Sequence, residues 1–189
     1  ATEFKAAILA GVITDNSENC QLAYPGGSFR NPYFETHLNA RDLGESKTIA
    51  DALINLGDAR QTAFGSSNTG VPYGWSEGNI NTWREANPGW SRIFSPAYRT
   101  ETYPTCIMNA AELYLARAEA ADRGWTTEST SAMFQAGVNA SFARWGLAAP
   151  AATYFSQTPH VLGAAGTNLK PIATQRWIAT FPNGIQGWR

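Results

Sequence analysis

The sequence feature that most constrains the fold is a pair of helical segments joined by a few residues. Residues 107–122 (IMNAAELYLARAEAAD) are rich in Ala, Leu, Glu and Arg, the strongest helix formers, and Gly124 follows them. Residues 128–145 form a second helical segment, which ends at Gly146. Its apolar side carries Phe134, Val138, Phe142 and Trp145. Because so few residues join the two helices, they must lie antiparallel, which predicts an αα-hairpin over residues 107–146.

Three other segments are expected to be largely irregular. Residues 1–45 are interrupted by Gly and Pro, so we expect irregular structure there, with a short strand at Leu22–Tyr24. Residues 58–106 are rich in Gly, Asn, Ser and aromatic residues, and we expect a long loop region. Residues 147–189 are expected to form a loop and then a helix over 168–181. A long irregular segment inside a compact domain is usually functional, so residues 58–106 are the first place to look for a site.

One further helix is predicted before the aromatic segment, at residues 46–57. Its apolar side chains recur at positions i, i+3, i+4 and i+7. They are Ile49, Ala52, Leu53 and Leu56. Thr48 and Asp51 resemble a capping box at its start, and Gly57 suits the position after its end.

Length and charge exclude several classes of protein. A chain of 189 residues is long enough for one hydrophobic core, so we expect a single domain. The formal net charge of −1 provides no basic field for nucleic acid or for an anionic membrane. The longest apolar runs, such as Ala6–Val12, are too short to cross a bilayer.

Cysteine and histidine give no metal-ligand spacing. The chain has two of each, and Cys20 and Cys106 either pair in an oxidising compartment or remain as two small buried thiols. His37 and His160 stand apart from each other, and each is expected to be a surface or hydrogen-bonded side chain. We therefore expect no metal and no other cofactor.

The strongest case for catalysis is a pair of carboxylates on one helix. Glu112 and Glu119 are seven residues apart, so both lie on the same helix face, and glycoside hydrolysis requires two carboxylates. The structural alternative is that each accepts hydrogen bonds from nearby backbone or pairs with an arginine, as Glu119 can with Arg123 four residues on. Nucleophile elbows, zinc motifs and phosphate-binding loops are absent from the sequence, so we predict no catalytic residue.

Four aromatic residues in the loop region are the candidate ligand contacts: Tyr73, Trp75, Trp83 and Trp90. Aromatic faces stack on the C–H faces of sugar rings, while amides and charged groups bind the hydroxyls. The polar neighbours in this segment are Asn68, Asn79, Asn81, Arg84 and Asn87. The mixture favours a glycan platform, and the alternative is that the rings fill space in the core.

Several short segments, taken in order, resemble the SusD/RagB family, in its SusD-like branch. No single segment is specific, but their order along residues 20–188 matches the family. The segments are Asn31-Pro32-Tyr33, Asp58-Ala59-Arg60, Ala111-Glu112, Ala118-Glu119-Ala120-Ala121, Arg123-Gly124-Trp125, Ala136-Gly137-Val138, Arg144-Trp145-Gly146 and Gln175-Arg176-Trp177-Ile178-Ala179.

This resemblance implies a function and a fold. Members of the family are outer-membrane lipoproteins at the cell surface that take part in nutrient uptake: they bind a glycan such as starch, or sometimes a peptide, and deliver it to a TonB-dependent SusC-like transporter. They are not enzymes. The implied fold class is mainly α, with tetratricopeptide-like antiparallel helix pairs, long irregular aromatic-rich loops and one short strand pair.

The chain also departs from the family pattern. Family members are more than twice as long, and the usual Asp-Pro-Arg is replaced by Asp58-Ala59-Arg60. Cys20 follows Ser17-Glu18-Asn19, which is no lipobox, so a lipid anchor would lie outside this chain. The resemblance therefore implies a single SusD-like domain fragment over residues 1–189, internal or C-terminal, with no ligand residue transferred by motif.

Two other functions stay open from the residues alone. A peptide- or protein-binding helical-repeat module would use the hairpin surface, for example at Arg117. A polysaccharide hydrolase would use Glu112 or Glu119 as its acid.

Overall fold

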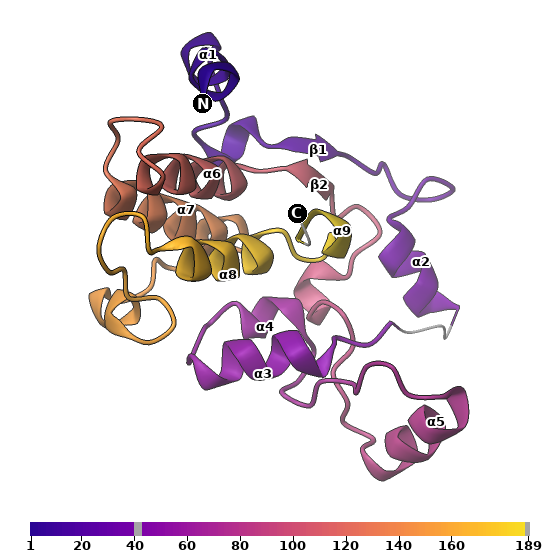
Figure 1. The fold of residues 1–189 in the computed structure, drawn as a ribbon. Helices are drawn as coiled ribbons and strands as arrows, with labels where there is room; N and C mark the ends of the chain where they lie inside the picture. The colour runs from indigo at the N-terminus through magenta and orange to yellow at the C-terminus, as the bar shows by residue number, and fades with distance from the viewer. Residues whose placement is uncertain (40–42, 188–189) are drawn as a thin grey trace. The chain divides into compact units, whose positions relative to one another are not determined.

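The structure, a computed structural model, describes residues 1–39 and 43–187 and divides into two compact units (Figure 1). The first unit consists of Ala1–Cys20 together with the chain from Cys106 onward, and the second consists of Gln21–Thr105. The fold is mainly helical, as predicted, with a two-stranded sheet of β1 (Cys20–Leu22) and β2 (Thr105–Met108). The predicted short strand therefore exists, two residues earlier than expected.

The first unit is built on the predicted hairpin. Helix α6 spans Ala110–Asp122, helix α7 spans Thr130–Arg144, and helix α8 (Leu169–Ala179) packs against both (Figure 1). Buried side chains of these helices form one apolar cluster together with Tyr154 from the loop before α8, and the cluster excludes water from the centre of the unit. The cluster includes Ala111, Leu115, Ala118, Phe134, Val138, Phe142, Tyr154 and Ile172. The hairpin expected at residues 107–146 is confirmed.

Local chemistry fixes where α6 and α7 begin and how closely they approach. Asn109 caps α6, and Glu112 completes the capping box by accepting a hydrogen bond from the Asn109 backbone N–H at 3.0 Å. Ser129 caps α7. A Cβ on Gly137 would lie 2.7 Å from Cγ of the buried Leu115, so this glycine lets the two helices come into close contact.

The segment after the hairpin is a loop followed by helix, as expected. It adds a 3₁₀ helix, η3 (Ala152–Ser156), before α8, and a short α9 (Gly184–Gly187) after it. The buried Asp122 at the end of α6 holds this loop: its Oδ2 accepts from the Asn168 backbone N–H at 3.0 Å, and its Oδ1 accepts from the Asn168 amide at 2.6 Å. Burial alone would raise the pKa of Asp122, but these hydrogen bonds outweigh it and lower the pKa.

The expectation of irregular structure over residues 1–45 is wrong in two places. Helix α1 spans Thr2–Ala10, and helix α2 spans Pro32–Leu38. The sequence TEFKAAILA of α1 consists largely of good helix formers, and α2 begins at a proline, whose fixed φ suits the first helical position. A 3₁₀ helix, η1 (Asn16–Glu18), follows α1. Residues 40–42 lie outside the described residues.

The cysteines are both free thiols in the structure. The expectation of two buried thiols is wrong for Cys20, which is exposed, whereas Cys106 is half-buried. Burial raises the pKa of the Cys106 thiol.

In the second unit the predicted helix at 46–57 is confirmed as α3 (Lys47–Asn55), and Gly57 follows it with a positive φ of 59°. The prediction of a capping box formed by Thr48 and Asp51 is wrong. The N-cap residue of α3 is Ser46, whose Oγ accepts from the Thr48 backbone N–H. The expectation of a loop over residues 58–106 is also wrong in part, because the polar and Gly-rich composition hid short helical segments. It contains α4 (Gln61–Phe64), α5 (Glu77–Ala86) and the 3₁₀ helix η2 (Pro96–Tyr98).

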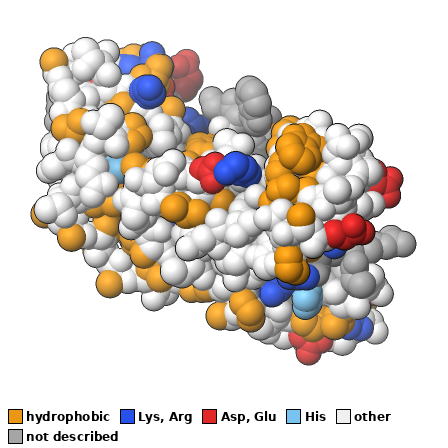
Figure 2. Space-filling view, turned by 90° about the horizontal axis from the view of Figure 1, so that it is seen from below, with side chains coloured by type: hydrophobic (Ala, Val, Ile, Leu, Met, Phe, Trp, Pro, Cys, Tyr) orange, Lys and Arg blue, Asp and Glu red, His pale blue; other side chains and the backbone are white. Residues whose placement is uncertain are grey.

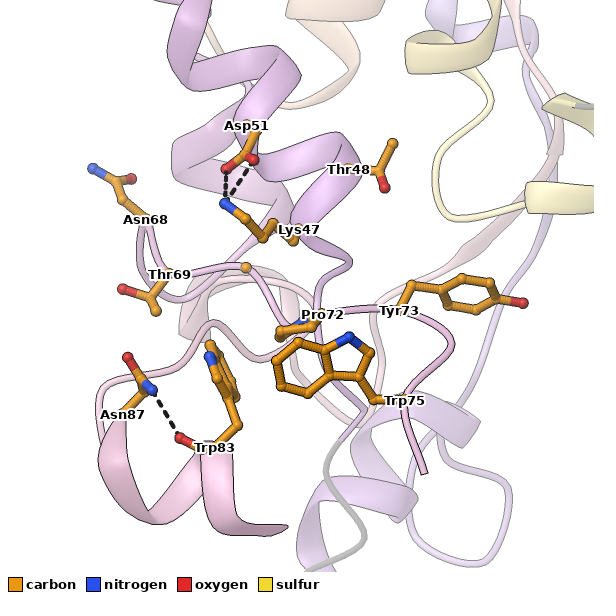
Figure 3. A pocket seen from close by; sticks show the side chains of 11 residues that line it. Lys47, Thr48, Asp51, Asn68, Thr69, Pro72, Tyr73, Trp75, Trp83 and Asn87 are labelled. Atoms are coloured by element: carbon orange, nitrogen blue, oxygen red, sulfur yellow. Dashed lines mark hydrogen bonds and ion pairs between the residues drawn. The ribbon is translucent and has the colours of Figure 1, made fainter. Parts of the chain in front are cut away.

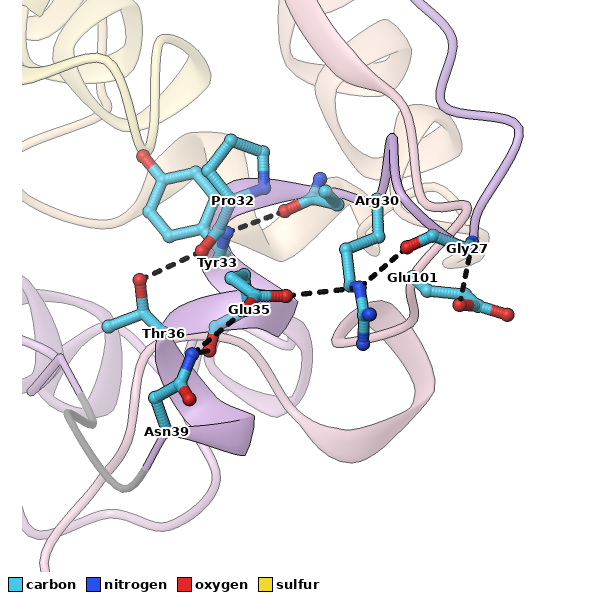
Figure 4. Close-up of polar contacts among 9 residues, drawn as sticks. Gly27, Arg30, Pro32, Tyr33, Glu35, Thr36, Asn39 and Glu101 are labelled. Carbon is cyan, nitrogen blue, oxygen red and sulfur yellow. Dashed lines mark hydrogen bonds and ion pairs between the residues drawn. The ribbon is translucent and has the colours of Figure 1, made fainter.

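The motif Asn31-Pro32-Tyr33 forms the start of α2. The Asn31 side chain accepts from the Tyr33 backbone N–H at 2.8 Å and donates to the Tyr103 carbonyl at 2.6 Å. Arg30 adds an ion pair with Glu35 at 3.0 Å (Figure 4). The motif is therefore a capped helix start that is also tied to a distant part of the same unit.

Asp58 and Arg60 form a buried ion pair in the second unit. The two side chains are fully buried, and the Arg60 Nη2 atom lies 2.6 Å from Asp58 Oδ2. Asp58 also accepts from the Arg60 backbone N–H at 2.9 Å. Loss of one partner of such a pair leaves an uncompensated buried charge, so the pair fixes the turn between α3 and α4.

Candidate functional site

The second unit contains an open pocket of about 810 Å³, a volume within the usual range for ligand sites. Its walls come from the start of α3, from the loop that precedes α5, and from α5 itself (Figure 3). The lining residues are Lys47, Thr48, Asp51, Asn68, Thr69, Gly70, Pro72, Tyr73, Trp75, Trp83 and Asn87. Three of the four aromatic residues predicted to contact a ligand therefore lie at one pocket.

The loop that bears Tyr73 and Trp75 is fastened to the start of α3 by backbone hydrogen bonds. The Lys47 N–H donates to the Val71 carbonyl at 2.8 Å, and the Val71 N–H donates to the Glu45 carbonyl at 2.8 Å. A Cβ on Gly70 would lie 2.5 Å from the Lys47 Cα, so only glycine permits this close approach. The pocket wall is thus held by main-chain contacts that do not depend on the exposed rings.

Trp83 is positioned by α5. Ser76 caps this helix, and the chain then brings Trp83 to the side of the helix that faces the pocket. The side chain of Asn87, the C-cap residue, donates to the Trp83 carbonyl at 2.8 Å (Figure 3). One helix therefore supplies both an aromatic face and an amide to the same wall.

The four predicted aromatic residues lie in different environments. Tyr73 is 88% exposed and Trp75 is 52% exposed, and Trp83 is half-buried. In Figure 3 the Trp75 and Trp83 rings lie on one side of the pocket with Pro72, whereas the Tyr73 ring points away from them.

Trp90 does not line this pocket. Its side chain is only 5% exposed, and two guanidinium groups lie over its ring, those of Arg84 at 4.6 Å and Arg92 at 4.4 Å from the ring centre. These are cation–π distances, so the ring is used in packing inside its unit.

The same unit contains a buried polar cluster centred on Glu45. Its Oε2 accepts from Ser91 Oγ at 2.6 Å and from the Gln61 side-chain amide at 3.0 Å. Its Oε1 accepts no hydrogen bond from any group in the described parts of the chain. Burial raises the pKa of this carboxyl, against the opposing effect of the two hydrogen bonds.

Sequence reasoning missed two of the pocket's polar residues, Lys47 and Asp51. They stand four residues apart on α3, and the ammonium of Lys47 lies 3.0 and 2.7 Å from the two carboxylate oxygens of Asp51 (Figure 3). The only signal in the sequence is their position opposite the apolar stripe of the helix. That position indicates exposure to solvent but not the loop that lies beside them.

The residues considered for catalysis have structural roles. Glu112 belongs to the α6 capping box, and Glu119 pairs with Arg123 at 2.8 Å, which confirms the structural alternative for both. His160 is buried against Tyr154 and hydrogen-bonded to Gln175, and His37 is hydrogen-bonded to Arg99. Within residues 1–39 and 43–187, no three His, Cys, Asp or Glu side chains are grouped so that they could hold a metal ion.

The charges of the chain nearly balance, with a formal net charge of −1. On the face drawn in Figure 2, charged side chains are few and scattered among uncharged polar and hydrophobic ones. Of the helices that the structure describes, none combines the length and the apolar character needed to cross a membrane.

A helical hairpin unit and a loop-rich unit with an aromatic pocket together define a mainly helical protein. The chain belongs to the SusD-like family, whose sequence profile, described as "Starch-binding associating with outer membrane", matches residues 1–189. This membership assigns the chain to the outer membrane. The family expected from the short segments is thereby confirmed.

Solved structures of SusD homologues share the fold. A homologue from Bacteroides vulgatus is 25% identical to this chain with a TM-score of 0.80. The match covers 99% of this chain and 44% of the homologue. A chitin-binding homologue from Flavobacterium johnsoniae is 24% identical to this chain with a TM-score of 0.77. The match covers 94% of this chain and 42% of the homologue. A SusD-like protein from Bacteroides thetaiotaomicron is 21% identical to this chain with a TM-score of 0.79. The match covers 99% of this chain and 45% of that protein. The chain thus spans less than half the length of these relatives. A search of curated proteins found no significant match.

Proposed function

We propose that this chain is the glycan-binding part of a non-catalytic outer-membrane protein, and that it holds the glycan in the pocket of the second unit. The observation that carries the proposal is the meeting of Tyr73, Trp75 and Trp83 at one open pocket of about 810 Å³. Exposed indole rings are costly in water unless a ligand covers them, and sugar rings offer the apolar faces that suit them.

The polar part of the lining suits hydroxyl groups. Asn68, Thr69 and Asn87 offer amide and hydroxyl groups that can both donate and accept, as sugar hydroxyls do. Most of the lining is uncharged, which matches a neutral oligosaccharide better than a phosphate or a strongly charged peptide. The family description as starch-binding and the chitin-binding relative support a glycan as the ligand class.

The role that follows is capture and delivery rather than turnover. Bound glycan would pass to a TonB-dependent SusC-like transporter, the partner implied by the family resemblance. The structural roles of Glu112 and Glu119 support a non-catalytic function, because the α6 capping box engages Glu112 and an ion pair with Arg123 engages Glu119.

Titration of the chain with maltohexaose and chitohexaose, followed by tryptophan fluorescence and calorimetry, tests the proposal. We expect binding that weakens at least tenfold in Trp75→Ala and Trp83→Ala, because stacked rings carry much of the contact energy at such sites. Trp125→Ala is the matched control, since this ring is also partly exposed but lies in the first unit. Equal loss in the control, or no response to either glycan, would contradict the proposal.

A further inference from the structure

The pocket has one feature that a generic aromatic platform does not require, which is the ion pair of Lys47 and Asp51. These are the only described lining residues that carry a charge at neutral pH. Both oxygens of the Asp51 carboxylate lie within hydrogen-bond distance of the Lys47 ammonium. The pair therefore presents a compensated charge to whatever fills the pocket.

Fold stability does not explain this pair. The Lys47 and Asp51 side chains are 58% and 45% exposed, and pairs of this kind add little to helix stability because solvent screens them. Lys47 is also the first residue of α3, where the positive end of the helix dipole disfavours a cation. An acidic residue would suit that position better, so the placement of the cation points to the pocket rather than to the helix.

The backbone fixes where this pair stands. Lys47 is held by its N–H bond to the Val71 carbonyl, and Gly70 packs directly against its Cα. In Figure 3 the pair lies on one side of Pro72, and the rings of Trp75 and Trp83 lie on the other. A sugar stacked on these rings would therefore meet the ammonium and the carboxylate with its hydroxyl edge.

We propose that the Lys47–Asp51 pair makes this pocket selective for uncharged glycans over acidic ones, with Asp51 as the specificity-determining residue; this inference rests on the proposed function. The Lys47 ammonium by itself would attract uronic acid carboxylates. Asp51 cancels that attraction and repels them, while both groups remain able to bind neutral hydroxyls. Removal of the Asp51 charge converts the pocket from compensated to cationic.

The test compares maltohexaose with maltohexaose oxidised at C6 to glucuronic acid units, by calorimetry at low salt. We expect the wild-type chain to bind the neutral sugar more tightly. In Asp51→Asn we expect the ratio of the two affinities to fall by about fivefold in favour of the acidic sugar, and 0.5 M salt to reduce this change because the charges are exposed. Lys47→Gln is expected to shift the ratio in the opposite direction.

Glu119→Gln is the matched control, since it removes the acid from another i,i+4 ion pair, which lies in the first unit and is partly exposed. Its affinity ratio is expected to equal that of the wild type. Retained neutral binding with the same ratio in Asp51→Asn as in the control would overturn this inference alone. Absence of wild-type binding to both maltohexaose and chitohexaose would overturn the proposed function, and the inference with it.

Discussion

At the scale of single residues, tryptophans of the same segment have different roles because their surroundings differ. Trp75 stands half in solvent at the pocket, whereas Trp90 is enclosed with the guanidinium groups of Arg84 and Arg92 over its ring. A ring buried in this way contributes its transfer free energy and its packing to the fold. An exposed ring contributes little until a ligand covers it.

This difference predicts opposite outcomes for two similar substitutions. Trp90→Ala is expected to lower the free energy of unfolding by about 3–5 kcal/mol, because it leaves a cavity and removes the ring over which the Arg84 and Arg92 guanidinium groups lie. Trp75→Ala is expected to change it by less than about 0.5 kcal/mol. Urea denaturation followed by circular dichroism measures both, and equal effects in the two variants would contradict the assigned environments.

Glu45 predicts a pH dependence of stability. Its folded-state pKa is raised above the ordinary value of 4.5 by burial. The folded state therefore favours the protonated carboxyl over the ionised one. The contribution of protonated Glu45 to the free energy of unfolding is complete below pH 4.5 and is lost as the pH rises through the folded-state pKa. In Glu45→Gln this loss is absent, and the variant should gain stability relative to the wild type as the pH rises.

The measurement is the free energy of unfolding of both proteins between pH 4 and pH 8. Glu77→Gln, an exposed substitution at the start of α5, controls for the general effect of charge removal. If the difference between Glu45→Gln and the wild type stays constant over this range, the buried carboxyl is not the group responsible.

At the scale of elements, the hairpin depends on one close approach between α6 and α7. Gly137→Ala would place its methyl group 2.7 Å from the buried Leu115 Cγ, which cannot move aside cheaply. The gain in helix propensity is about 1 kcal/mol, and overpacking costs about 1–3 kcal/mol, so we expect a net loss of stability. Thermal denaturation should show a lower midpoint.

Gly78→Ala on α5 is the matched control for this prediction. Nothing lies within 4 Å of the Cβ it would add, so its midpoint should stay the same or rise. A rise in both variants would show that the helices can separate without cost.

The start of α6 supplies a second prediction at this scale, because Glu112 caps the helix rather than acting in catalysis. Glu112→Ala removes the acceptor for the Asn109 backbone N–H and is expected to cost about 1 kcal/mol of stability. Glu112→Gln keeps an acceptor oxygen and should cost less. Release of reducing sugar from polysaccharide by the wild type, lost in Glu112→Gln, would instead revive the hydrolase alternative.

At the scale of the whole molecule, the division into two units leads to a prediction of where a bound ligand slows amide hydrogen exchange. All the lining residues of the pocket belong to Gln21–Thr105, and the hairpin belongs to the other unit. Saturation with a bound glycan should therefore slow amide hydrogen exchange near residues 46–51, 68–75 and 83–87, and leave α6 and α7 unchanged. Hydrogen-exchange mass spectrometry measures this, and protection confined to the hairpin around Arg117 would favour the helical-repeat peptide-binding alternative.

The sequence by itself determined the elements whose signals are local. The hairpin follows from helix formers with a repeating apolar face, and Gly57 and Gly146 mark helix ends because few other residues adopt a positive φ. The surplus of aromatic residues outside any period also pointed to the segment that lines the pocket. Short helices such as α2 and α5 were not predicted from the sequence, because their signal is a cap and a few polar residues, which are also typical of a loop.

Only the tertiary structure decided which residues form the site. Trp75 and Trp90 are chemically the same, and what separates them is the burial of one by arginines and the exposure of the other at a pocket. Lys47 and Asp51 joined the pocket because Gly70 brings a distant loop against α3. Such contacts depend on where segments far apart in sequence meet, and a periodicity of three or four residues carries no information about that meeting.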